Sequence, residues 1–201
     1  MLAVVLSMML FALIGAISPG PVNIIATGTA ASFGFKRTLP HVIGATLSYT
    51  LIVFLAGVGL SQLLFAFPAL SQVLQLCGAA FLLYMAYKIG TAPVQSLSDE
   101  DVQQTPPSML QGALSQGLNP KAWLVSMSGV AVFVNVNNPY YLYLLAFCLV
   151  SFFMCFIGIS SWAIMGDVIR RFLSNAKQQR LFNRLMALLL VILVALMLFS
   201  F

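Results

Sequence analysis

Ser18-Pro19-Gly20-Pro21 interrupts the first apolar segment of the chain, and Asn119-Pro120-Lys121 interrupts the fourth. Proline lacks a backbone N–H and its ring clashes with the preceding helical turn, so it breaks an α-helix. In lipid, the freed backbone groups need protein, water or a ligand as partners. Two such interruptions at corresponding places in two halves of a chain are the best sequence indication of a transport site.

The composition places these interruptions in a membrane. Of the 201 residues, 61% are hydrophobic and 6% are charged, and the mean hydropathy is +1.03. Such a chain cannot present a solvated surface, so the sequence predicts an all-α integral membrane protein surrounded by the lipid bilayer. The net charge of +5 comes from short, dispersed basic groups that form no stripe. We therefore expect no nucleic-acid partner.

Six apolar segments are long enough to cross a bilayer as helices, which takes about 20 residues. Only one connection is long and polar, and it separates the third segment from the fourth. The sequence therefore predicts a first three-helix repeat (1–90), a linker (91–108) and a second three-helix repeat (109–201), which form one transport domain. The expected helices are 2–31, 39–64, 72–89, 109–134, 140–166 and 178–200.

Basic residues predict the orientation of the chain. They follow the first helix, end the third and surround the turn into the sixth, whereas the connections at 65–71 and 135–139 carry no charge. The positive-inside rule then places the linker 90–108 in the cytoplasm and both termini outside. A first segment that failed to span would instead put the N-terminus inside. No Lys or Arg precedes Lys36, so we expect no cleaved signal and the first segment stays in the mature protein.

Three helices per half require the halves to sit in opposite orientations, which is the inverted-repeat plan. Ala31 and Met109, the cytoplasmic ends of the first and fourth helices, are each about 12 residues from their break, or roughly 18 Å at helical rise. We therefore expect both breaks at a similar depth in the membrane.

The polarity of the broken pieces predicts a binding site for an amino acid. Pro21 and Pro120 suit the first helical position, with Gly20 and Asn119 as caps, so two helix N-termini meet and favour a carboxylate. The carbonyl ends of the preceding pieces, near Ile17-Ser18 and Gly117-Leu118, suit an ammonium group. An amino acid carries both groups on one carbon.

Polar side chains around the breaks are the candidate substrate ligands. Lys121 either anchors a substrate carboxylate or merely extends to the cytoplasmic surface. Gln116 and Asn119 share a helical face and either contact substrate or bond between helices. Asn23 either bonds the substrate or satisfies freed carbonyls, and Ser18 is expected to cap.

The second helix and the end of the fifth carry further candidates. His41, Ser48 and Tyr49 lie near one stripe of the second helix. His41 is the only histidine and either exchanges protons or sits at the interface. Asp167 is a second proton-coupling candidate, with an ion pair to Arg170 or Arg171 as the alternative. No acidic residue lies in mid-membrane, which favours a neutral or zwitterionic substrate.

The remaining reactive and aromatic side chains are expected to be structural. Cys77, Cys148 and Cys155 lie in apolar runs without a CxxC pair, so we expect them to pack as small hydrophobic residues. Trp123 and Trp162 are typical of interface belts.

The same residues form a recognisable pattern that spans the chain down to Arg184. The sequence resembles the LysE/RhtB family of amino-acid exporters, most closely the subgroup of the cysteine and O-acetylserine exporter. The positions that carry the family motifs are Ser18-Pro19-Gly20-Pro21-Val22-Asn23, Gly34-Phe35, Gly44, Gly78 to Tyr84, Lys88 and Gly117-Leu118-Asn119-Pro120-Lys121.

This resemblance implies efflux of amino acids across a bacterial inner membrane, coupled to the proton gradient. In such a membrane, the termini that the positive-inside rule places outside lie in the periplasm. Pro19, Gly20, Pro21, Asn119, Pro120 and Lys121 match the family motif residue by residue. Many members carry an acid early in the second helix, where this chain has Tyr49 or Ser48, so we expect a small neutral amino acid as substrate, not lysine or arginine.

Other function classes fit the sequence less well. A membrane thiol-redox relay needs paired cysteines in the broken helices, a hydrolase needs a base beside Ser18, and a metal-ion permease needs a ligand cluster. We expect no enzyme activity, no cofactor and no metal site. The coupling ion and the oligomeric state stay open, a homodimer being one arrangement.

Overall fold

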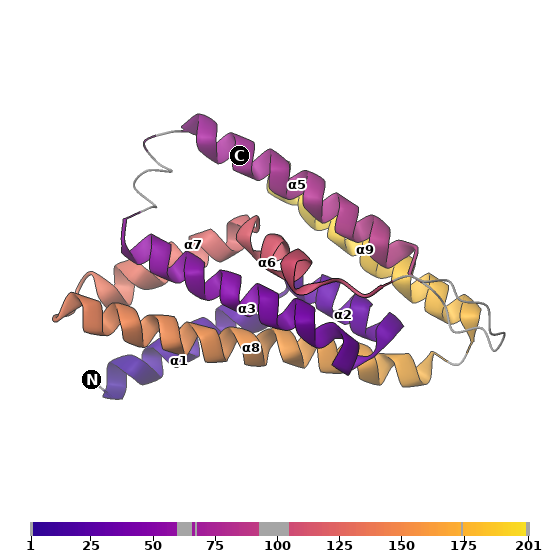
Figure 1. Ribbon diagram of the computed structural model, residues 1–201, viewed down its shortest axis with the longest axis horizontal. Coiled ribbons are helices and arrows are strands. Elements are labelled where there is room, and N and C mark those ends of the chain that lie inside the picture. Colours follow the sequence, from indigo (N-terminus) through magenta and orange to yellow (C-terminus); the bar gives the residue numbers. More distant parts are fainter. Residues whose placement is uncertain (1, 60–65, 67, 93–104, 174, 200–201) are drawn as a thin grey trace.

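The computed structural model describes residues 2–59, 66, 68–92, 105–173 and 175–199, and all regular structure in these ranges is helical (Figure 1). The elements are α1 (Leu2–Ile17), α2 (Pro21–Phe33), α3 (Phe35–Gly57), α5 (Pro68–Gly90), α6 (Met109–Gly117), α7 (Pro120–Gly129), the π-helix η1 (Val130–Val134), α8 (Tyr140–Phe172) and α9 (Ala176–Phe199).

Both predicted breaks are present. α1 and α2 form one bent segment with an angle of 61° between them, and α6 gives way to α7 at Leu118 and Asn119. Pro21 and Pro120 each stand at the start of the second piece, where proline costs no helical hydrogen bond and its fixed φ suits the helix. The prolines therefore set where each second piece begins.

Three helices of the described part are long and apolar enough to cross a membrane, namely α3, α8 and α9, and the bent pair of α1 and α2 would be a fourth. The continuous piece Pro120–Val134 is apolar but shorter. The structure thus has several membrane-type helices.

Some helix ends differ from those expected from hydropathy. α3 begins at Phe35, not 39, because Gly34 has a φ of 84° and turns the chain directly from α2 into α3. α3 ends at Gly57, and the expected continuation over 60–64 lies outside the described residues. α8 continues past 166 to Phe172, because hydropathy marks only the apolar part of a helix and misses its polar last turns.

Each broken helix packs against the second helix of the other half. α8 contacts α1 and α2, while α3 contacts α6 and α7, and α3 and α8 also contact each other. Glycines permit this close approach, since a Cβ on Gly158 would lie 2.6 Å from Ala16 Cβ, and one on Gly44 would meet the backbone of Met109. α3 and α8 therefore hold the two broken helices together around the breaks.

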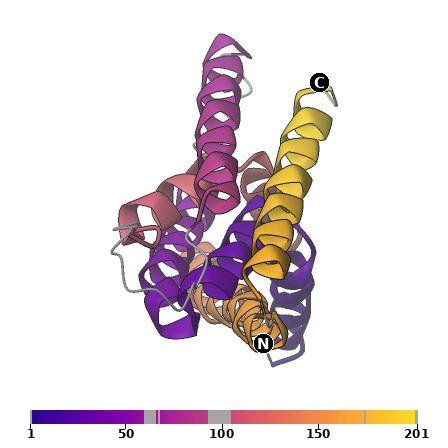
Figure 2. The ribbon, with the colours of Figure 1, turned by 90° about the vertical axis from the view of Figure 1, so that its right-hand side faces the viewer.

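α5 and α9 form a separate layer. They contact each other, and α9 also contacts α2. In the turned view, both helices project away from the other helices (Figure 2). Cys77, expected to be buried, lies exposed on α5, whereas Cys148 and Cys155 are buried in α8. The large apolar side chains exposed on α9 are suited to lipid.

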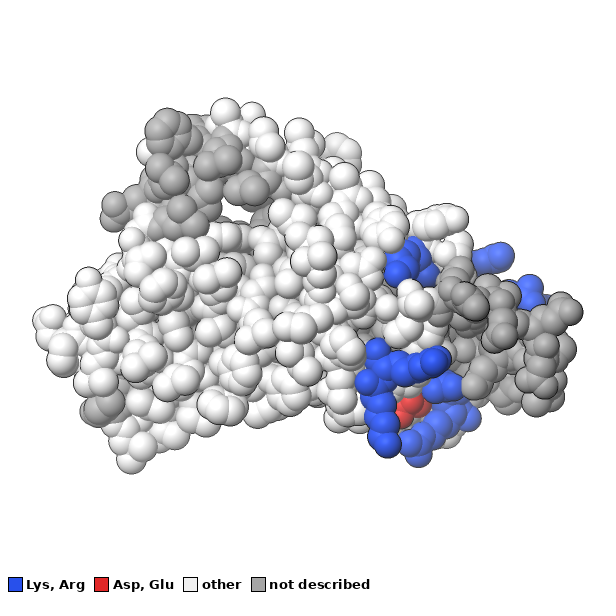
Figure 3. All heavy atoms as spheres, viewed as in Figure 1, with Lys and Arg blue, Asp and Glu red and all other residues white. Residues whose placement is uncertain are grey.

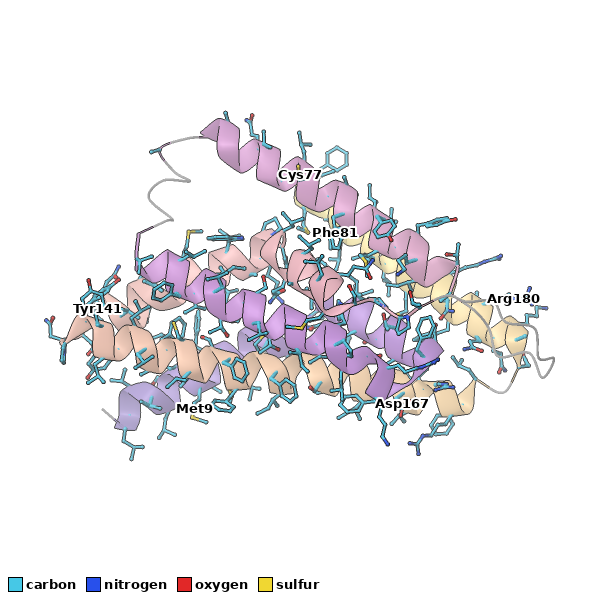
Figure 4. All side chains as sticks on the ribbon, in the orientation of Figure 1. Met9, Cys77, Phe81, Tyr141, Asp167 and Arg180 are labelled. Carbon is cyan, nitrogen blue, oxygen red and sulfur yellow. The ribbon has the colours of Figure 1, made fainter. Side chains whose placement is uncertain are left out.

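Charged side chains gather at one end of the molecule (Figure 3). Lys88 lies in the last turn of α5, and Arg170 and Arg171 lie in the last turn of α8. Asp167 and Arg180 are found at this end, and Tyr141 is at the opposite one (Figure 4). We call the charged end the basic end. It is formed by the start of α3, the ends of α5 and α8 and the start of α9 (Figure 1), which carry Lys36, Arg37, Lys88, Arg170, Arg171, Lys177, Arg180 and Arg184.

Candidate functional site

A narrow cavity lies where the two breaks meet. The volume open to water in it is about 30 Å³, which is room for about two water molecules. The cavity draws residues from both broken helices and from α3 and α8, and none of them carries a carboxylate. Its lining residues are Gly15, Ala16, Gly20, Val22, Asn23, Tyr49, Gln116, Asn119, Lys121, Ala122, Val125, Cys155 and Ile159.

The Lys121 side chain crosses from the second break to the first. Its Nζ donates to the carbonyl oxygen of Ser18 at 2.7 Å, to Ser18 Oγ at 2.7 Å and to the carbonyl oxygen of Pro19 at 3.2 Å. The side chain is half-buried. In the described part of the chain, the single ion pair joins Asp167 to Arg171, so no carboxylate pairs with Lys121 there. Lys121 therefore ties the two breaks together.

At the first break, side chains satisfy the carbonyls that the missing helical turn leaves free. Asn23 Nδ2 donates to Ala16 O at 2.8 Å and to Ser18 O at 3.0 Å, and Ser18 Oγ donates to Gly15 O at 3.0 Å. Gly20 is the cap of α2 but offers no side-chain bond. Both amide donors of Asn23 are thus used by the backbone, while its side chain still lines the cavity.

At the second break, Asn119 holds the start of α7. Its Oδ1 accepts from the backbone N–H of Lys121 at 3.1 Å, which is an N-cap. Its Nδ2 donates to Gln116 Oε1 at 3.2 Å, so the two amides share a face as their spacing predicts. The N–H of Lys121 is therefore already bonded, and fewer free amides face the cavity than the sequence suggested.

Two tryptophans donate hydrogen bonds at the breaks. Trp162 Nε1 donates to Ile17 O at 2.9 Å, and Trp123 Nε1 donates to Gly117 O at 2.9 Å. These are the carbonyl ends that the sequence analysis assigned to an ammonium group. The position of Trp123 in the sequence, two residues after Lys121, could have indicated that it lies beside the second break.

The stripe on α3 divides between the cavity and its surroundings. Tyr49 is 5% exposed and lines the cavity. Ser48 is not among the lining residues and faces the end of α6, where a Cβ on Gly117 would lie 3.1 Å from its Oγ. Pro19, Pro21 and Pro120 shape the backbone without lining the cavity. Cys155 and Ile159 of α8 do line it, although their sequence positions did not mark them as ligands.

Neither proton-coupling candidate lines the cavity. His41 is fully buried and lies beside the backbone of Val22, which does line the cavity, although neither ring nitrogen makes a hydrogen bond of normal geometry with the described residues. It lies where α3 crosses α6, with its carbonyl facing Gly112. Asp167 lies at the basic end, 3.7 Å from Arg171 in the expected ion pair.

The family model described as LysE type translocator matches residues 13–200 of the chain. The chain therefore belongs to this family, a class of membrane translocators. The cysteine/O-acetylserine efflux proteins of Salmonella typhi and of Escherichia coli (strain K12) are each 29% identical to it over 182 residues, which cover 90% of this chain and 90% of each relative. The protein of that name from Shigella flexneri serotype 5b (strain 8401) is 28% identical over the same length. No solved structure matches the chain.

Proposed function

We propose that this chain is a secondary transporter that exports small neutral amino acids, of the cysteine and O-acetylserine type, across the bacterial inner membrane. The observation that carries the proposal is the cavity between the two breaks, bridged by Lys121 bound to Ser18. Family membership and the names of the curated relatives support amino-acid export. Among the described residues, the cavity is lined by amides and a lysine and by no carboxylate, which favours a neutral substrate.

In this proposal, residues 1–90 and 109–201 are two inverted three-helix repeats, joined by a cytoplasmic linker over 91–108. The basic end then faces the cytoplasm by the positive-inside rule, and both termini face the periplasm. The position of the N-terminus at the opposite end from the basic residues supports this orientation (Figures 1 and 3). The packing of each broken helix against the other half supports one transport domain.

Transport proceeds by alternating access, in which the two halves rock around the breaks. A cavity of about 30 Å³ is too narrow for an amino acid, so the halves must move apart on one side to admit one. The carboxylate binds near the N-termini of α2 and α7, and the ammonium binds near the carbonyl end of α1. The proton gradient drives the cycle, with His41 and Asp167 as the coupling candidates.

The test is efflux of radiolabelled cysteine or O-acetylserine from loaded cells that produce the chain. Lys121→Ala should lower the efflux rate by about tenfold or more, since hydrogen bonds to charged groups contribute about 1.5–3 kcal/mol each. Lys177→Ala, which removes an exposed lysine at the basic end, is the matched control and should export normally. Unchanged efflux in Lys121→Ala at equal protein level would remove Lys121 from the site. Export of lysine in place of the neutral amino acids would refute the substrate class.

A further inference from the structure

Ser18 and Pro19, directly after α1, form a complete binding site for a primary ammonium group. Three oxygens surround Lys121 Nζ, namely the carbonyl oxygens of Ser18 and Pro19 and the hydroxyl of Ser18, at 2.7 to 3.2 Å. A primary ammonium has three N–H donors, so these oxygens satisfy all of them. The carbonyl end of a helix also carries partial negative charge. We call this set of three oxygens the ammonium subsite.

The ammonium subsite does not rely on an acidic side chain. Among the described residues, no carboxylate pairs with Lys121, so backbone and hydroxyl oxygens alone hold its positive charge. Because these oxygens recognise a primary ammonium and not lysine as such, they would bind the ammonium of an amino acid equally well. Lys121 and such a substrate would therefore compete for the same three oxygens.

We propose that the ammonium subsite takes the α-ammonium group of the transported amino acid, and that Lys121 is an intramolecular competitor which the substrate displaces. The displaced Lys121 ammonium then pairs with the substrate carboxylate. This inference rests on the proposed function, and it assigns the substrate's two charged groups to named atoms of the chain.

The geometry around Lys121 suits such an exchange. Its backbone is fixed at the start of α7, because Asn119 Oδ1 holds its N–H, whereas its long side chain can rotate about its own bonds once the three hydrogen bonds of Nζ are exchanged. Gly20 leaves room for this movement, since a Cβ there would lie 3.3 Å from Nζ and 3.4 Å from Cδ. Lys121 can therefore leave the ammonium subsite without moving α7.

The exchange also keeps the charges of the cavity balanced. A zwitterion supplies an ammonium for the subsite and a carboxylate for the displaced lysine, so no charge is left unpaired in a low-dielectric site. An amine without a carboxylate would displace Lys121 and leave it unpaired. A carboxylate without an amine would meet a lysine that is already bound to Ser18. The site thus selects ligands that carry both groups.

The test measures binding to the purified protein in detergent by isothermal titration calorimetry. The ligands are cysteine, its decarboxylated analogue cysteamine and its deaminated analogue 3-mercaptopropionate. Lys121→Met removes the competing charge, so cysteamine should bind to it about tenfold or more tightly than to the unmodified chain. The expected factor follows if Lys121 occupies the ammonium subsite about nine-tenths of the time, because only the remaining tenth can then bind cysteamine. Binding of 3-mercaptopropionate should be lost. Lys177→Met is the control and should leave both affinities unchanged.

A second measurement needs no variant and covers the case in which Lys121→Met does not fold. In the unmodified chain, saturating methylammonium should tighten the binding of 3-mercaptopropionate, because occupation of the ammonium subsite frees Lys121 for the carboxylate. Independent or mutually weakening binding of these two probes would overturn the inference. So would an unchanged cysteamine affinity in Lys121→Met, which is the result for a lysine that only anchors carboxylate. Failure of the unmodified chain to bind either cysteine or O-acetylserine would instead count against the proposed function.

Discussion

The first and second breaks meet at one cavity, yet they are built from different parts. At the first, Gly20 caps α2 without a side-chain bond. The free carbonyls at and just after the end of α1 accept hydrogen bonds from Asn23 and Lys121. At the second, Asn119 both caps α7 and contacts Gln116. The first break leaves oxygens that accept hydrogen bonds from outside it. At the second break, the Asn119 side chain already bonds the backbone N–H of Lys121, and the break contributes the cationic side chain of Lys121.

The two breaks therefore have complementary chemical groups although their residues differ. The oxygens of Ser18 and Pro19 need a donor, and Lys121 from the other half supplies it. The first break thus lacks a donor for its oxygens, and the second lacks acceptors for the Lys121 ammonium group. Substitutions at matched positions of the two breaks test whether the first break supplies acceptor oxygens and the second supplies the cationic donor.

The largest expected effect comes from the glycines that face the two breaks. Gly158→Val would drive a side chain into Ala16 of α1, and Gly78→Val would drive one into Leu118 beside α7. Overpacking costs about 1–3 kcal/mol. We expect the upper part of this range for Gly158, because α8 is packed against α1, α2 and α3, and the lower part for Gly78, because α5 stands in the outer layer with α9. Thermal unfolding in detergent should show the larger fall in midpoint for Gly158→Val, and the reverse order would contradict this account of the packing.

An intermediate effect is expected from the caps. Asn119→Ala removes the acceptor for the Lys121 N–H and should destabilise the protein by about 1 kcal/mol, whereas Asn119→Ser keeps a capping oxygen and should lose less. Gly20→Ala has no cap bond to lose, and its Cβ would lie 3.3 Å from Lys121 Nζ. It should therefore weaken cysteine binding with little change in the unfolding midpoint. Equal losses of stability at Asn119→Ala and Gly20→Ala would show that the two breaks are capped alike.

The sequence was sufficient for the features that depend on local chemistry. Proline at the first helical position located both breaks, and Gly20 and Asn119 are the caps as predicted. The Asp167–Arg171 pair follows from helical spacing. Such features involve residues near one another in the chain, so their energetics can be read without knowing how the helices pack.

The features that the sequence did not predict depend on how helices rotate and cross. Tyr49 lines the cavity and Ser48 does not, because the rotation of α3 is set where Gly44 meets α6. Likewise, the sequence placed Lys121 at the second break but did not predict that its side chain points toward Ser18. The burial of His41 arises from the same crossing, where its backbone faces Gly112. The spacing of residues along one helix does not specify how that helix rotates against its neighbours.

The smallest expected effect separates the two tryptophans. Trp162→Phe and Trp123→Phe each remove one indole N–H while keeping an aromatic ring, so each should cost about 0.5–1.5 kcal/mol in stability. Their consequences for binding should differ. Trp162 lies on α8 and bonds Ile17 in the other half, directly before Ser18, whereas Trp123 bonds Gly117 within its own half. Loss of the Trp162 bond loosens the end of α1 that directly precedes the ammonium subsite, so cysteine affinity should fall in Trp162→Phe and hold in Trp123→Phe. If both variants lost affinity equally, the oxygens of the first break would have no greater part in binding than those of the second.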